Sequence, residues 1–183
     1  MNKKQNKARL DNRWVCSVGH AFRNFNPPSR HHALSRPSAC QRLNVRQTNM
    51  HLFSKSQYSH VLRQACAMAT ESSGTEICGL IIDTGCHLSF VKTKNICRKA
   101  GGFAFSGPDI RRIVAATKVL GQEIVGTFHS HPVGVATPGR SDIENAVDDS
   151  LMLIFDCVGK KGRLWKIKNG KARPLSFGFL KNK

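Results

Sequence analysis

The sequence predicts a single α/β domain with a mixed, mostly antiparallel sheet flanked by two or three helices. A chain of 183 residues accommodates one ordinary domain and a tail. From Met50 onward, segments with helical periodicity alternate with segments of strand periodicity. Several of the predicted strands are joined by short, Gly-containing turns, which is typical of hairpins. No apolar run reaches the roughly 18 residues that a membrane helix needs, so we expect no membrane span.

The first half of this domain predicts a helix, a hairpin and a second helix. Ser54 followed by Gln57 favours an N-cap, and the helix is expected to run to about Glu71. Residues 77–82 and 87–96 are predicted strands joined by a turn at 83–85, so they should form a hairpin. A second helix is expected to open at Ser106 or Gly107 and to end at Gly121.

The second half predicts four strands and one short helix. Residues 123–128 form an apolar strand that leads directly to His129. Ser141 and Glu144 have the spacing of a capping box, which predicts a short helix beginning there. The remaining strands are expected at 151–158, 163–167 and 174–180.

The first 49 residues differ from the rest of the chain. They contain ten Lys and Arg but one acidic residue, Asp11, so this segment holds about half of the total net charge of +18. Their composition indicates disorder. A basic arm, a targeting peptide and a solvated extension are open interpretations. We favour an over-extended gene start, with the domain occupying 50–183, because ordered patterning begins directly after Met50.

The cysteines favour a cytoplasmic protein. There are seven of them, and none form a C-x-x-C pair, so a cysteine-ligated zinc site is not expected. The odd number and the lack of a secretory signal favour a reducing compartment.

The segment His129-Ser130-His131-Pro132 predicts a metal site. Side chains at i and i+2 of a strand point to the same face, so the two imidazoles can converge on one ion. Asp142 follows after a loop long enough to bring its carboxylate back to them. Two nitrogens and one oxygen would leave the fourth zinc position open, as in catalytic sites. The alternative is a pair of ordinary surface histidines at a strand end.

These residues resemble the signature of the JAB/MPN (Mov34, PAD-1) metalloprotease domain, which reads H-x-H-P, six residues, Ser, two residues, Asp. The stretch from Glu76 to Leu80 is similar to the E-x-C-G-L motif of its bacterial, stand-alone members. The resemblance covers roughly residues 50–170. It implies a single JAB/MPN-like (cytidine-deaminase-like) domain.

The resemblance also implies a zinc-dependent peptidase or isopeptidase. His129, His131 and Asp142 would hold Zn²⁺, and Glu76 would act as the general base. The substrate would be a protein or peptide, with the C-terminus of a ubiquitin-like or sulfur-carrier protein as one candidate. The sequence departs from the pattern at Gly139, where the family has a Ser that stabilises the tetrahedral intermediate. A water molecule, the backbone, Ser130 or Ser141 could substitute for that hydroxyl.

Two other functional classes remain open from the sequence. One is a non-catalytic MPN-like interaction module, although such domains usually lose the metal ligands that this chain retains. The other is a basic protein associated with nucleic acid, suggested by charge alone. We do not expect nucleic-acid binding, because the aromatic and basic residues are not interleaved as in stacking surfaces. The Lys- and Arg-rich residues 160–171 could instead dock an acidic protein.

Overall fold

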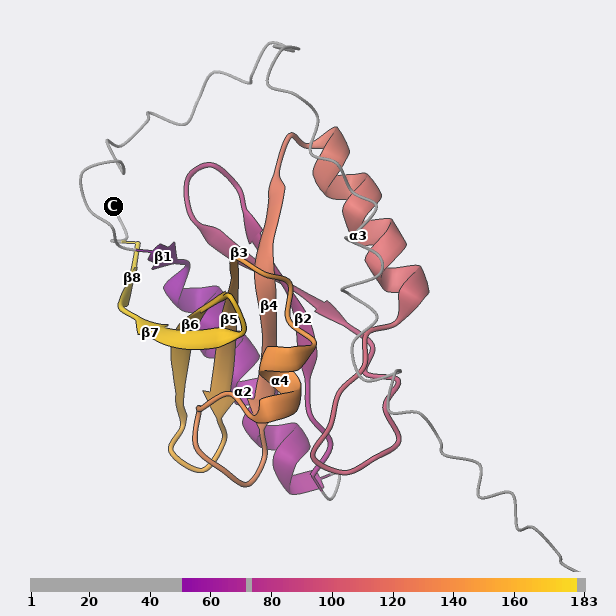
Figure 1. Cartoon of the computed structure of the whole chain (residues 1–183), viewed down its shortest axis with the longest axis vertical. Helices are drawn as coiled ribbons and strands as arrows, with labels where there is room; N and C mark the ends of the chain where they lie inside the picture. The colour runs from indigo at the N-terminus through magenta and orange to yellow at the C-terminus, as the bar shows by residue number, and fades with distance from the viewer. Residues whose placement is uncertain (1–50, 72–73, 181–183) are drawn as a thin grey trace, which may run out of the picture.

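Eight strands form one mixed sheet in the order β7-β6-β5-β4-β2-β3-β1-β8. The computed structural model describes residues 51–71 and 74–180 (Figure 1). Within them the strands are β1 (His51–Phe53), β2 (Cys78–Asp83), β3 (Leu88–Thr93), β4 (Glu123–His131), β5 (Ser150–Asp156), β6 (Lys161–Lys168), β7 (Lys171–Leu175) and β8 (Phe177–Phe179). The predicted α/β class with a mixed sheet is therefore confirmed.

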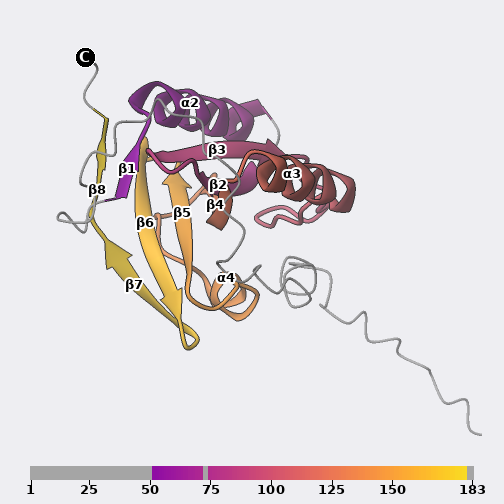
Figure 2. The ribbon, with the colours of Figure 1, turned by 90° about the horizontal axis from the view of Figure 1, so that it is seen from above.

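Three helices cover the two faces of the sheet. Helix α2 (Lys55–Glu71) packs on one face, where Val61 and Ala65 join a core that includes Phe128 and Phe155. Helix α3 (Gly107–Val119) packs on the opposite face through Ile110 and Ile113. The short helix α4 (Arg140–Glu144) lies on that second face as well, apart from α3 (Figures 1 and 2). None of the helices in the described part of the chain has the length and apolar character needed to cross a membrane.

Most of the local predictions are confirmed. The Ser54 hydroxyl accepts a hydrogen bond from the Gln57 amide at 3.4 Å, as expected for the N-cap of α2. Strands β2 and β3 form the predicted antiparallel hairpin. Ser106 caps α3 by accepting from the Asp109 amide at 3.4 Å.

Two predictions need correction, and one strand was not predicted. The predicted last strand, 174–180, is two strands, β7 and β8, and β7 forms a hairpin with β6. Strand β1 was not predicted, because three residues are too short to show a period and its partners are distant in sequence. Ser141 does not cap α4: the N-cap is Gly139, whose amide donates to the Asp142 carboxylate at 2.7 Å. The prediction for residues 1–49 lies outside the described residues.

Strand β4 is central and carries the histidine pair. It runs antiparallel to β2 and parallel to β5, so its neighbours fix it on both sides. Gly79 of β2 is required for this packing: a Cβ placed there would lie 2.3 Å from the Val91 carbonyl oxygen and 2.5 Å from the Phe128 ring. The glycine in Cys78-Gly79-Leu80 therefore lets β2 and β4 pair closely beneath the site.

Candidate metal centre

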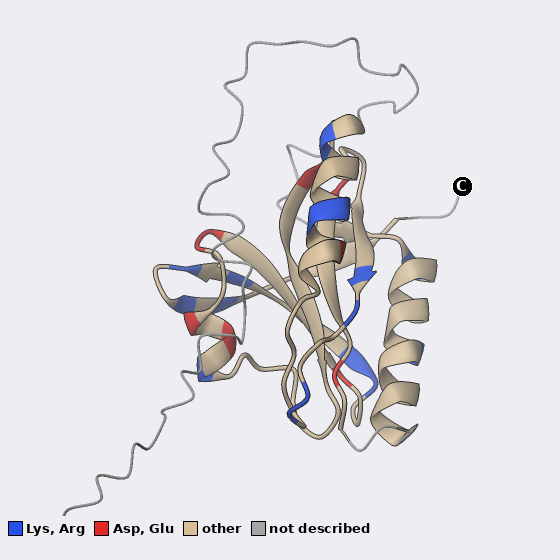
Figure 3. Ribbon diagram, turned by 90° about the vertical axis from the view of Figure 1, so that its right-hand side faces the viewer, with Lys and Arg blue, Asp and Glu red and all other residues tan. Residues whose placement is uncertain are grey.

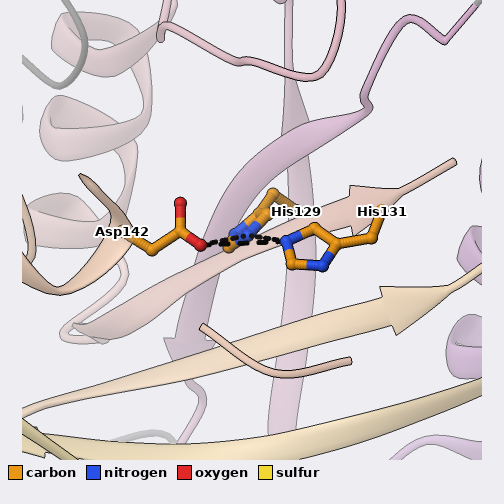
Figure 4. A group of neighbouring side chains, drawn as sticks. All are labelled: His129, His131 and Asp142. Atoms are coloured by element: carbon orange, nitrogen blue, oxygen red, sulfur yellow. Dashed lines mark hydrogen bonds and ion pairs between the residues drawn. The ribbon is translucent and has the colours of Figure 1, made fainter. Parts of the chain in front are cut away.

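Strand β4 and helix α4 bring His129, His131 and Asp142 together (Figure 4). The two histidines point to the same face of β4, and Asp142 reaches them from the first turn of α4. His129 is fully buried, whereas the side chains of His131 and Asp142 are 19% and 13% exposed. The group is thus open to solvent on one side.

The distances between the three ligand atoms fit a tetrahedral zinc ion. The Nε2 atoms of the two histidines are 3.1 Å apart, and Oδ2 of Asp142 lies 3.5 Å and 3.7 Å from them. Bonds of about 2.0–2.2 Å at tetrahedral angles imply ligand separations of roughly 3.3–3.5 Å. Two imidazoles and one carboxylate are also the donor set of a catalytic zinc site, which leaves a fourth position for water. The residues present therefore fit the ion.

The ionisation of His129 and Asp142 also suits a metal, whereas the pKa of His131 is shifted the other way. Burial lowers the pKa of His129, against the opposing influence of Asp142, which favours the neutral imidazole that metals require. Burial alone would raise the pKa of Asp142, but hydrogen bonds from His129 and His131 lower it, so the carboxylate is ionised at neutral pH. For His131, hydrogen bonds to Asp142 and to the Val135 carbonyl outweigh burial and raise its pKa.

Glu76 lies beside the three ligands, two residues before β2. It is 5% exposed, and burial raises the pKa of its carboxyl group to about 7, with His131 lowering and Asp142 raising it. Its backbone is held from two sides. The Ile77 amide donates to the Ser130 hydroxyl at 2.9 Å, and the Asn95 side-chain amide donates to the Glu76 carbonyl at 2.8 Å.

The three candidates for an oxyanion donor are not gathered at the ligands. Ser130 lies between the two histidines in sequence, but its side chain is on the opposite face of β4 and bonds Ile77. Ser141 is exposed in the first turn of α4. Gly139 is near Asp142 but has no side chain, and its amide is bonded to the carboxylate. Sequence reasoning also missed Asn95 and Phe103, which contact Glu76 and His129 and carry no motif.

Ser130→Ala is expected to lower the free energy of unfolding by about 1–3 kcal/mol, because it leaves the Ile77 amide buried without its acceptor. Urea denaturation of the metal-free protein measures this loss. Ser89→Ala is the control: its half-buried hydroxyl bonds the Gln57 side chain, which can turn to solvent, so a smaller loss is expected. Equal losses in the two variants would contradict the structural role of Ser130.

A comparison with protein families establishes the class of the chain. The profile of prokaryotic homologs of the JAB domain matches residues 58–168, which is more than half of the chain. The matched range contains Glu76, both histidines and Asp142. The chain therefore belongs to this family of prokaryotic JAB-domain proteins, as the sequence motifs predicted. A search of curated protein sequences finds no match.

One of three similar solved structures supports the same fold. A protein from Desulfitobacterium hafniense, solved in solution, is 20% identical, with a TM-score of 0.61 over 73% of this chain and 94% of that one. A JAB1/MPN domain protein from Archaeoglobus fulgidus is 13% identical, with a TM-score of 0.44 over 73% of this chain and all of the other. A Salinibacter ruber protein is 17% identical, with a TM-score of 0.43 over 66% and 88% of the two chains. The Desulfitobacterium hafniense protein, with a TM-score above 0.5, shares the fold of this chain.

Proposed function

We propose that this protein is a zinc-dependent metallopeptidase that hydrolyses an amide bond in a protein or peptide. The observation that carries the proposal is the tetrahedral arrangement of His129, His131 and Asp142 with a buried carboxyl group, Glu76, beside it. Three ligands and a neighbouring acid–base group are the parts that hydrolysis by a metal-activated water requires.

Each residue would have a separate role in the reaction. A zinc ion held by the three ligands would polarise the substrate carbonyl and make water a stronger acid. Glu76 would take the proton from the attacking water and give it to the leaving amine, for which a pKa of about 7 is well placed. Asp142, fixed by the Gly139 amide, would keep its Oδ2 aimed at the two imidazoles.

The surface next to the ligands supports a peptide substrate. Val133, Val135 and Val158 are 88%, 68% and 70% exposed. Val133 and Val135 follow His131 closely in the chain, and His131 Nδ1 bonds the Val135 carbonyl. Val158 follows Cys157, whose amide donates to the His131 carbonyl. Lys and Arg residues also lie along the β6–β7 hairpin (Figure 3). We propose an extended protein terminus as the substrate, with a ubiquitin-like or sulfur-carrier protein as the first one to test.

Metal content and hydrolysis test the proposal together. The purified protein is expected to hold about one zinc ion per chain and to cleave carrier proteins extended beyond their C-terminus, with the cleavage abolished by a chelator and restored by Zn²⁺. Absence of metal uptake would reject the metal site. Zinc binding without hydrolysis of any peptide or carrier substrate would reject the peptidase.

One observation favours a second candidate function, a non-catalytic JAB-domain module. In the JAB/MPN metalloproteases that this sequence resembles, a Ser hydroxyl stabilises the reaction intermediate, and Gly139 stands in its place. The Ser130 hydroxyl is bonded to the Ile77 amide, and Ser141 is exposed, so neither is placed with the ligands. Losing one such donor typically costs about 3–4 kcal/mol of activation free energy. A metal-binding domain with weak or absent turnover is consistent with that loss.

Gly139→Ser is expected to raise kcat by up to about 100-fold, because it supplies the missing hydroxyl. The site accommodates the change: Gly139 has a φ of −74°, and a Cβ there would lie 3.4 Å from Asp142 Oδ2, close to ordinary contact. Steady-state hydrolysis measures the gain. Gly139→Ala adds the same Cβ without a hydroxyl and is expected to leave kcat unchanged. A gain in the alanine variant would point to loop rigidity instead.

A further inference from the structure

One nitrogen of the buried ligand His129 has no hydrogen-bond partner. Among the buried side-chain nitrogen and oxygen atoms of residues 51–71 and 74–180, Nδ1 of His129 is the one without a partner. The other histidine differs: Nδ1 of His131 lies 2.8 Å from the Val135 carbonyl oxygen, which fixes its tautomer and directs Nε2 to the ligand group. A hydrogen bond at Nδ1 therefore orients the ring of His131 from the side away from the ligand group, but no such bond orients His129.

An aromatic ring takes the place of that hydrogen bond. The Phe103 ring stacks on the His129 imidazole with centroids 4.4 Å apart and planes at 23°. By contrast, the two histidine rings are 5.0 Å apart and tilted by 47°. A stacked neighbour this close blocks rotation of the imidazole out of its plane, because the ring would enter the volume of Phe103.

Phe103 is itself held firmly. It is 4% exposed and contacts Phe105 edge-on, with ring centroids 5.3 Å apart. The Asn95 side chain bonds the backbone on both sides of it: its Nδ2 donates to the Gly102 carbonyl at 3.1 Å, and its Oδ1 accepts from the Ala104 amide at 3.0 Å.

The same Asn95 amide donates to the Glu76 carbonyl at 2.8 Å. One side chain thus connects the backbone of Glu76 to the loop that presents Phe103. The Asn95 side chain therefore helps to hold both Phe103, which stacks on His129, and Glu76.

We propose that Phe103 is a positioning residue of the metal centre, whose stacked ring holds the His129 imidazole with Nε2 directed at His131 and Asp142. The inference deepens the metal site of the proposed function and rests on it. Phe103 touches neither substrate nor metal in this role. It acts through His129, so replacing Phe103 should weaken metal binding and change the geometry of the metal ligands.

The test compares zinc binding in variants of the full-length protein. Phe103→Leu removes the ring, and Phe103→Met, which keeps more of the buried volume, is prepared alongside it in case the leucine variant does not fold. Phe105→Leu is the matched control, because Phe105 is 5% exposed and belongs to the same core cluster. This variant removes one edge contact from Phe103 but keeps the ring that stacks on His129 and the Asn95 hydrogen bonds that hold its loop. Zinc affinity is measured by chelator competition, and ligand geometry by the visible absorption spectrum of the Co²⁺-loaded protein.

The Phe103 variants are expected to bind zinc about 10–100-fold more weakly than the wild type, which is the usual effect of losing a group that orients a metal ligand. Their Co²⁺ spectra are expected to change, whereas Phe105→Leu should keep the wild-type affinity and spectrum. Unchanged affinity in the Phe103 variants, or an equal loss in Phe105→Leu, would overturn the inference. A wild-type protein that binds zinc without hydrolysing any substrate would overturn the peptidase and leave the role of Phe103 intact. A wild-type protein that binds no zinc would overturn both.

Discussion

Replacing Glu76 with Gln is expected to abolish hydrolysis while the protein still binds zinc. Gln is nearly isosteric and keeps the side chain in its buried place, but it cannot accept the proton of the attacking water. Loss of a general acid–base group typically lowers kcat by about 10²–10⁴-fold. Because Glu76 is outside the group of three ligands, zinc affinity should stay close to that of the wild type.

The control for this variant is Glu144→Gln. Glu144 is also near the ligands in the chain, but its side chain is 57% exposed and bonds Arg140. Its removal should change neither kcat nor zinc binding. Hydrolysis retained by Glu76→Gln would reject Glu76 as the general base. Loss of zinc in the same variant would instead make Glu76 part of the metal site.

Asp142→Asn is expected to lower zinc affinity by more than about 100-fold, and activity with it. The loss of a group that merely orients a ligand costs about 10–100-fold, so removing a charged ligand should cost more. Asn retains an oxygen that can accept from the Gly139 amide, so the cap of α4 should persist. Chelator competition measures the affinity, and circular dichroism checks that the fold is intact.

Asp109→Asn is the matched control for the loss of charge. Asp109 lies in the first turn of α3, as Asp142 does in α4, and its carboxylate also accepts from a backbone amide, that of Lys94 at 2.9 Å. Zinc affinity should be unchanged in this variant. If Asp142→Asn bound zinc as tightly as the wild type, the metal would need a third ligand other than Asp142.

The metal-binding group could be predicted from the sequence because its signals are local. A strand period places His129 and His131 on one face, and this needs no knowledge of the rest of the fold. Asp142 and Glu76 are different, since spacing alone shows only that they can reach the histidines. Their inclusion depended on the resemblance to JAB-domain proteins, and the observed distances and burial agree with it.

The surroundings of the site could not be predicted because they depend on contacts between distant segments. Ser130 looked like a candidate donor in the H-x-H segment, but pairing with the residue after Glu76 fixes its hydroxyl on the far face of β4. Phe103 reaches His129 from a loop 26 positions earlier, a distance at which no periodicity applies. The cap of α4 was misplaced because glycine offers no side-chain signal, whereas Ser141 does.

The C-terminal strands give the sheet a further property. One residue, Ser176, separates β7 from β8, yet these strands stand at opposite ends of the strand order. The segment from Lys171 to Phe179 therefore connects the two edge strands of the sheet directly through the chain (Figure 2). A single proteolytic nick at the exposed Ser176 would cut this covalent link, while β7 would stay paired with β6 and β8 with β1. The two margins of the sheet are thus joined covalently through one residue, far from the metal ligands in sequence.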